Sequence, residues 1–182
     1  MPFVDFSDRP WQPEIMAPRS VPCGLREALF DQGSLTRRLK ERHNNKFFVQ
    51  VLQQHWAIPT ESEQMFLRSD HYCANIREVL LFGSGRPVVF ARSVLPKSSL
   101  TGDNQVLLDL GSKPLGEYIF SQPDLVREAI EMAKIPARQL NEYLDFNYQQ
   151  ESAWARRSLF HLNGKPISVC EVFLPDIAVS DF

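Results

Sequence analysis

Cysteine and histidine are scarce in this chain of 182 residues, and neither is spaced as a disulfide or a metal site would require. Cys23, Cys73 and Cys170 contain no Cys-x-x-Cys pair, so we expect reduced thiols rather than a disulfide framework or a zinc ribbon. The four histidines show no ligand spacing either. The sequence therefore predicts no bound metal.

A strong charge of one sign and a long apolar run near the start are also lacking. The formal net charge of −2 gives no electrostatic reason to expect a nucleic-acid partner. Residues 1–23 hold charges and prolines without an apolar stretch, which argues against a signal peptide or a membrane span there. We expect a cytoplasmic protein, and a monomer.

The length and composition are those of one globular domain. A hydrophobic content of 43% and a charged content of 23% are ordinary for a soluble fold, and this length can bury a substantial core. Residues 1–23 are predicted to form an irregular arm, because Pro10, Pro13, Pro18 and Pro22 interrupt regular structure. Residues 24–182 are predicted to form the single functional domain.

A pattern of 20 residues occurs twice without a gap, in Arg77–Pro96 and Arg156–Pro175, with six identical positions. Each copy reads as strand, tight turn and strand, because a Gly-centred turn (Ser84-Gly85 and Asn163-Gly164) separates two runs of strand-forming residues. The sequence therefore predicts two similar β-hairpins.

Written out as regular ladders, the hairpins bring charges onto apolar faces. Arg77 is predicted to face Arg92 in the first hairpin, and Arg156 to face Glu171 in the second. Two guanidinium groups on an apolar face repel each other and lose hydration, so an anionic ligand would stabilise them. The alternative is structural: Arg92 and Arg156 reach solvent at strand ends, and Glu171 simply pairs with Arg156.

The remaining elements are less regular. We expect a short helix over 25–30, a second helix from Leu35 capped by Ser34, a strand over 46–56 and a short helix starting near Pro114. The segment 122–135 permits either state, and its later part is interpreted as helical; 137–152 is expected to be a polar insertion with a helical stretch. Clustered hairpins with helices outside them indicate an α+β fold with an antiparallel sheet.

These residues resemble the chorismate pyruvate-lyase (chorismate lyase) family of ubiquinone biosynthesis. The likeness covers most of 25–175 except the region after Phe120, and its motifs are Ser34–Leu39, Ile76–Leu81, Gly85–Pro87, Ala91–Pro96, Leu110–Phe120, Trp154–Ser158, Gly164–Pro166 and Glu171–Pro175. The chain departs from the pattern at Leu35, where methionine is expected, at Ala91, where glycine is usual, and in a longer segment over 131–152.

The resemblance implies a buried ligand pocket under lid-like segments, with substrate-binding residues Leu35, Arg77, Leu115 and Glu171. The two carboxylates of chorismate suggest Arg92 as a further substrate-binding residue. Arg77 and the backbone N–H groups of Leu35 and Leu115 would hold the ring carboxylate of chorismate. Glu171 would bind the C4 hydroxyl, and Arg92 would pair with the enolpyruvyl carboxylate. Arg77 and Glu171 are the expected catalytic residues.

The implied reaction converts chorismate into 4-hydroxybenzoate and pyruvate. The ring becomes aromatic, so no cofactor is expected, and catalysis would rest on orientation and charge placement in a dry pocket. Whether Glu171 acts as a base or only orients the substrate stays open, and slow product release controlled by segments near Leu35 and Leu115 is a further hypothesis.

Two other functions remain possible from the sequence. The same fold serves as the effector-binding domain of HutC-type transcription regulators, which sense a small molecule and break no bond. The short stretch before the first matched motif leaves no room for the DNA-binding unit of those proteins, and this favours the enzyme. A lyase variant that releases another hydroxybenzoate isomer is the second alternative.

Overall fold

The computed structural model describes residues 9–13, 21–68, 73–175 and 177. Seven antiparallel strands form one sheet in the order β1-β5-β6-β7-β4-β3-β2. The strands are β1 (Gln12–Pro13), β2 (Phe48–Ala57), β3 (Ala74–Gly83), β4 (Arg86–Pro96), β5 (Val126–Pro136), β6 (Ser152–Leu162) and β7 (Lys165–Phe173). The predicted α+β class with an antiparallel sheet is confirmed.

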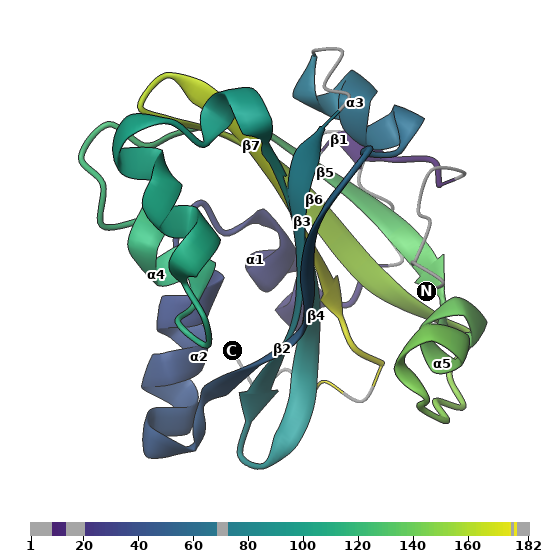
Figure 1. The fold of residues 1–182 in the computed structure, drawn as a ribbon. Coiled ribbons are helices and arrows are strands. Elements are labelled where there is room, and N and C mark those ends of the chain that lie inside the picture. The colour runs from purple at the N-terminus through teal and green to yellow at the C-terminus, as the bar shows by residue number, and fades with distance from the viewer. Residues whose placement is uncertain (1–8, 14–20, 69–72, 176, 178–182) are drawn as a thin grey trace.

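Helices cover both faces of this sheet (Figure 1). On one face lie α1 (Cys23–Phe30), α2 (Leu35–His43), α4 (Leu115–Ile119) and the 3₁₀ segment η4 (Gly102–Asp109). The opposite face carries α3 (Glu61–Leu67) and α5 (Ala137–Leu144). Short 3₁₀ turns, η2 (Asn44–Lys46) and η3 (Lys97–Ser99), connect elements at the ends of strands.

The duplicated pattern forms the hairpins β3–β4 and β6–β7, as predicted. Their second strands pair with each other, from Val89 with Phe173 to Val94 with Ser168, so the two hairpins meet at the centre of the sheet. Ser84 and Asn163 take positive φ angles of 52° and 51°, followed by Gly85 and Gly164, as the turn sequence requires. The repeat therefore builds the middle four strands of the fold.

The predicted register is correct in the second hairpin and wrong in the first. Arg156 pairs with Glu171 in an unbroken ladder, as expected. In the first hairpin a register shift between Leu81 and Phe82 moves the ladder by one residue, so Arg77 faces Ser93 and Arg92 faces Glu78. Because side chains alternate, this β-bulge turns Arg92 to the face opposite Arg77.

The segment 122–135 was expected to be helical in its later part, and this expectation is wrong. It forms β5, which pairs with β6 along its whole length and with β1 at Met132 and Glu131. The strand Gln12–Pro13 also lies in a stretch expected to be irregular, although most of residues 1–23 lies outside the described part of the chain. Ladder partners on both sides outweigh the helical propensity of the segment.

Two helix starts match the sequence. The Ser34 side chain accepts a hydrogen bond from the Arg37 backbone N–H at 3.3 Å, and α2 begins at Leu35. Pro114 directly precedes α4, which begins at Leu115. A Cβ on Gly116 would lie 2.8 Å from Thr36 Oγ1, so a glycine at this position lets α4 approach α2 closely. The two helix starts thus lie beside each other over the sheet.

Candidate active site

A cavity lies between the sheet and the pair α2 and α4. Its wall is mostly apolar, and among the described residues three charged side chains line it. The lining residues are Leu35, Thr36, Val49, Arg77, Val79, Leu81, Ala91, Ser93, Pro114, Leu115, Gly116, Ile119, Phe120, Arg127, Phe160, Val169 and Glu171. Such a concave, largely apolar space with few polar groups is typical of a small-molecule site.

Arg77 enters the cavity from β3 and is only 1% exposed. Its guanidinium donates to Gln54 Oε1 at 2.9 Å, to the Gly111 carbonyl at 2.8 Å and to the Lys113 carbonyl at 3.3 Å. These acceptors are all neutral, and the Nε atom is buried without a hydrogen-bond partner. Burial lowers the pKa of Arg77. The side chain is thus held by three hydrogen bonds, and no carboxylate of the described residues forms an ion pair with it.

Glu171 enters the cavity from β7 and is tied to a second arginine. Arg156 Nε donates to Glu171 Oε2 at 2.6 Å, and the Arg156 residue is fully buried. Arg156 Nη1 also donates to the carbonyls of Ala28 and Asp31, at 2.8 and 3.1 Å. The structural alternative considered from the sequence is therefore half correct, since Glu171 pairs with Arg156, but this arginine does not reach solvent.

Arg127 on β5 is the third charged residue of the cavity, and the sequence did not single it out. Its guanidinium carbon lies 4.5 Å from the centre of the Phe160 ring and 5.3 Å from that of Phe120. Nη1 donates to the Asp31 carbonyl at 2.8 Å, and Nε is buried without a partner. Burial, with repulsion from Arg156, lowers the pKa of Arg127 to about 10, against the attraction of Glu171 and Asp31.

The sequence did not single out Arg127, because 122–135 permits either a helix or a strand and only its later part is interpreted as helical. A register shift between Arg127 and Ala129 sets Arg127 opposite Phe160, on the cavity face. Only the strand assignment and this shift together reveal that orientation. The sequence contains one signal for this strand, since Arg127 is followed by residues compatible with a β-strand up to Pro136.

Leu35 and Leu115 both line the cavity as the first residues of α2 and α4. The backbone N–H of a first helical residue has no acceptor within its own helix, so each helix start offers a donor for a ligand. Lys40 Nζ and Glu117 Oε2, 2.6 Å apart, join the two helices at the surface. The covering helices are thus linked to each other beside the cavity.

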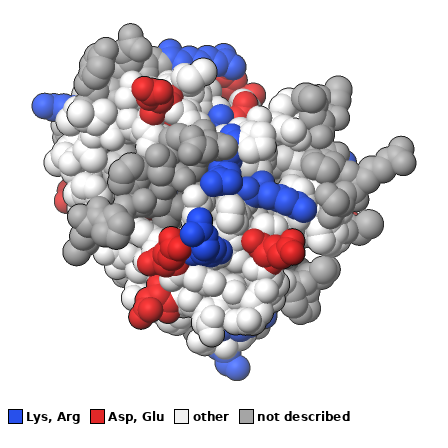
Figure 2. Space-filling view, turned by 90° about the vertical axis from the view of Figure 1, so that its right-hand side faces the viewer, with Lys and Arg blue, Asp and Glu red and all other residues white. Residues whose placement is uncertain are grey.

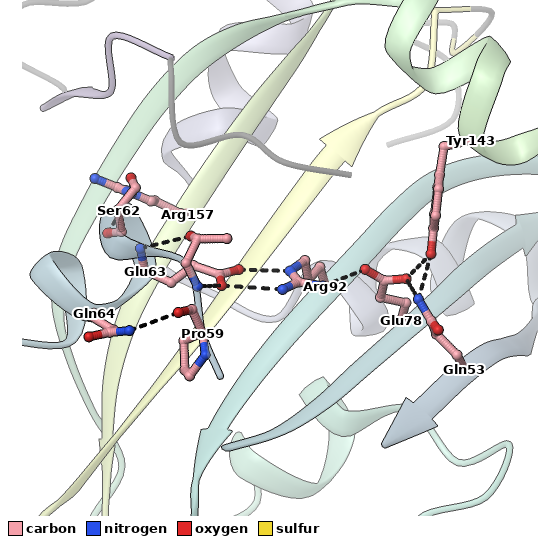
Figure 3. A network of polar contacts seen from close by, with 10 residues as sticks. Gln53, Pro59, Ser62, Glu63, Gln64, Glu78, Arg92, Tyr143 and Arg157 are labelled. Atoms are coloured by element: carbon pink, nitrogen blue, oxygen red, sulfur yellow. Dashed lines mark hydrogen bonds and ion pairs between the residues drawn. The ribbon is translucent and has the colours of Figure 1, made fainter. Parts of the chain in front are cut away.

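Arg92 does not line this cavity. On the opposite face of the sheet its Nε donates to Glu63 Oε1 at 2.7 Å and its Nη1 to Glu78 Oε1 at 2.6 Å (Figure 3). Tyr143 and Gln53 donate to the other oxygen of Glu78. Although burial lowers it, the pKa of Arg92 is raised overall by Glu63 and Glu78. The prediction that Arg77 and Arg92 lie on the same face of the sheet, where both could bind one ligand, is therefore wrong.

No group of three or more His, Cys, Asp or Glu side chains that could hold a metal ion occurs among the described residues. Within the same ranges, no helix is long and apolar enough to cross a membrane.

The α+β fold of this chain is shared with solved structures of other proteins. A GntR-family transcriptional regulator from Bacillus cereus matches with a TM-score of 0.55 at 12% identity, over 74% of this chain and 95% of the other. The C-terminal domain of the histidine utilization repressor from Pseudomonas syringae matches with a TM-score of 0.52 at 11% identity, over 72% and 92%. At such low identity these likenesses show the fold alone.

Sequence comparison gives the family. The model of the family described as chorismate lyase matches residues 8–180. A protein of Aromatoleum aromaticum named "Probable chorismate pyruvate-lyase" is 41% identical, over 86% of this chain and 88% of the relative. One of Yersinia enterocolitica named "Chorismate pyruvate-lyase" is 32% identical, over 87% and 85%. This chain belongs to the chorismate lyase family.

Proposed function

We infer that this protein is a lyase that converts chorismate into 4-hydroxybenzoate and pyruvate, the step that leads towards ubiquinone. The observation that carries the inference is that Arg77 and Glu171 both line one largely apolar cavity in a chain that belongs to the chorismate lyase family. An arginine without a counter-ion suits a carboxylate, and a carboxylate suits a hydroxyl group. Chorismate presents both groups, on opposite carbons of its ring.

We propose the following orientation. The ring carboxylate accepts hydrogen bonds from Arg77 and from the backbone N–H groups of Leu35 and Leu115. The C4 hydroxyl donates to Glu171, whose other oxygen is bound to Arg156. The apolar side chains of the lining contact the ring faces and exclude water, which strengthens each of these polar contacts.

The chemistry needs no external reagent. The C4–H bond breaks, its electron pair forms the new ring double bond between C3 and C4, and the C3–oxygen bond breaks. If the C4 proton passes directly to the enolpyruvyl methylene carbon, pyruvate leaves as such. If the proton passes to Glu171, the enolate of pyruvate leaves and then takes this proton at its methylene carbon. Aromatisation of the ring supplies the driving force, so the protein contributes orientation and charge placement, and we propose that it uses no cofactor.

We also propose that the protein is a cytoplasmic monomer that binds no nucleic acid. On the face that carries α5, basic and acidic side chains are interspersed (Figure 2), which fits the net charge of −2. A nucleic-acid partner would favour a basic surface.

The test is to incubate the purified protein with chorismate, without metal or nucleotide, and to separate the products by chromatography against an uncatalysed control. We expect equal amounts of 4-hydroxybenzoate and pyruvate. Pyruvate with another hydroxybenzoate isomer would indicate the variant lyase. Unchanged chorismate, bound tightly in a calorimeter, would instead support an effector-binding domain.

A further inference from the structure

Two guanidinium groups in the cavity, those of Arg77 and Arg127, form no direct ion pair with a carboxylate of the described residues, although Glu171 and Asp31 attract Arg127 from a greater distance. Every hydrogen bond that Arg77 donates goes to an amide oxygen, and Arg127 donates only to the Asp31 carbonyl. Arg156, which does not line the cavity, is balanced by Glu171. The protein thus leaves two positive charges beside the cavity, and a dianion would neutralise both.

The surroundings of the Arg127 guanidinium favour binding of an anion. Its guanidinium lies over the rings of Phe160 and Phe120, which shield it from water on that side. Nη1 is fixed by the Asp31 carbonyl, while Nε is buried with its N–H unsatisfied. A buried, unsatisfied charged donor is costly, and a ligand carboxylate would relieve that cost.

The strand order places Arg127 where the second carboxylate of the substrate belongs. Arg77 on β3 and Arg127 on β5 lie four strand spacings apart, about 19 Å between strand axes, and Glu171 on β7 lies between them. In chorismate the C4 hydroxyl is opposite the ring carboxylate, and the enolpyruvyl ether is attached to C3, next to C4. With the hydroxyl at Glu171, the enolpyruvyl group extends away from Arg77.

We propose that Arg127 binds the enolpyruvyl carboxylate of chorismate and thereby distinguishes the substrate from the product. This proposal rests on the proposed function and takes over the role that the sequence suggested for Arg92. 4-Hydroxybenzoate keeps the ring carboxylate and the hydroxyl but has lost the enolpyruvyl group. Arg127 therefore contacts the substrate and has no carboxylate to bind in the product complex.

The experiment compares Arg127→Gln with Arg77→Gln in two assays: kcat/KM for chorismate, and Kd for 4-hydroxybenzoate by calorimetry. We expect Arg127→Gln to lower kcat/KM about 10- to 100-fold, the range for a lost hydrogen bond to a charged group, and to change Kd less than about threefold. Arg77→Gln should weaken both. Arg138→Gln removes an exposed charge on α5 that pairs only with Glu142, and should change neither.

Equal losses in both assays for Arg127→Gln would overturn the proposal, since they would indicate a structural role, and so would an unchanged kcat/KM. Melting temperatures of all variants test whether the fold persists. If Arg127→Gln is unfolded, Arg127→Lys is measured in its place, because lysine keeps the positive charge. We again expect a lower kcat/KM for chorismate without a comparable change in the Kd for 4-hydroxybenzoate. Failure of the unaltered protein to cleave chorismate would remove the proposed function instead, so the two failures are distinguishable.

Discussion

Arg156 Nε and Glu171 Oε2 lie 2.6 Å apart across the β6–β7 ladder, beneath the cavity. The same guanidinium is fixed by the carbonyls of Ala28, in α1, and Asp31, just after it. The orientation of Glu171 is therefore set by a fully buried arginine held by a helix, and not by the ligand. A carboxylate held in this way can act on a substrate without first being reoriented.

Glu171→Gln tests what this carboxylate does. The amide keeps the shape, and its oxygen can still accept from Arg156, while the negative charge and the basic oxygen are lost. We expect kcat to fall about 100-fold or more, within the usual contribution of a positioned acid or base, with the Kd for 4-hydroxybenzoate changing much less. Single-turnover measurements with chorismate would show the loss. Full turnover would exclude a base and leave only a hydrogen-bonding role.

Arg77→Ala should abolish measurable turnover, because it removes the proposed carboxylate anchor and leaves Gln54 and the Gly111 carbonyl without their donor. Chorismate turnover and 4-hydroxybenzoate binding measure the effect. Retained binding of 4-hydroxybenzoate would contradict the proposed orientation.

Arg157→Ala is the matched change on the opposite face of β6. Arg157 pairs with Glu131 at 2.6 Å, and its guanidinium carbon lies within 4.6 Å of the ring centres of Trp11 and Phe66. We expect a lower melting temperature but an unchanged Kd for 4-hydroxybenzoate. A similar loss of binding in Arg77→Ala and Arg157→Ala would count against the assignment of the two faces.

Arg92→Met tests the corrected place of Arg92. The change leaves Glu63 and the fully buried Glu78 without their shared cation, and losing one partner of a buried ion pair costs about 3–5 kcal/mol. We expect this loss of unfolding free energy in urea denaturation, with the Kd for 4-hydroxybenzoate kept in the folded fraction. A large loss of ligand affinity at full stability would return Arg92 to the ligand site.

Lys40→Gln tests whether the link between α2 and α4 controls product release. The Lys40–Glu117 ion pair is partly exposed, and such pairs contribute about 0.2–1 kcal/mol. We expect 4-hydroxybenzoate to dissociate up to about fivefold faster in stopped-flow experiments, and added salt to accelerate release in the unaltered protein but not in the variant. Arg37→Gln, which breaks an exposed pair within α2, is the control and should leave release unchanged. Equal release rates in both variants would exclude the link as a barrier.

The sequence specified the local elements well where short-range chemistry decides them. The Gly-centred turns, the Ser34 cap and the helix start after Pro114 all occur as expected. The helix predicted for the later part of 122–135 was wrong, because Val126–Pro136 forms β5. There the preference of the segment is overridden by its partners in the sheet, which are distant in sequence.

The two copies of the repeat show why the site could be predicted only in part. Their sequences suggest one register for both hairpins, yet the first contains a β-bulge and the second does not. A shift of one residue moves every following side chain to the other face, so Arg92 leaves the cavity face while Glu171 stays on it.

The sequence by itself thus determined the family, the two hairpins, the helix starts over the cavity and the position of Arg77 and Glu171 on strands. The tertiary structure alone decided which face Arg92 takes, that Arg156 fixes Glu171, and that Arg127 joins the cavity. The physical reason is that a turn or a cap depends on a few adjacent residues. A bulge, or the facing of a charged side chain, depends instead on how strands far apart in the chain pack together.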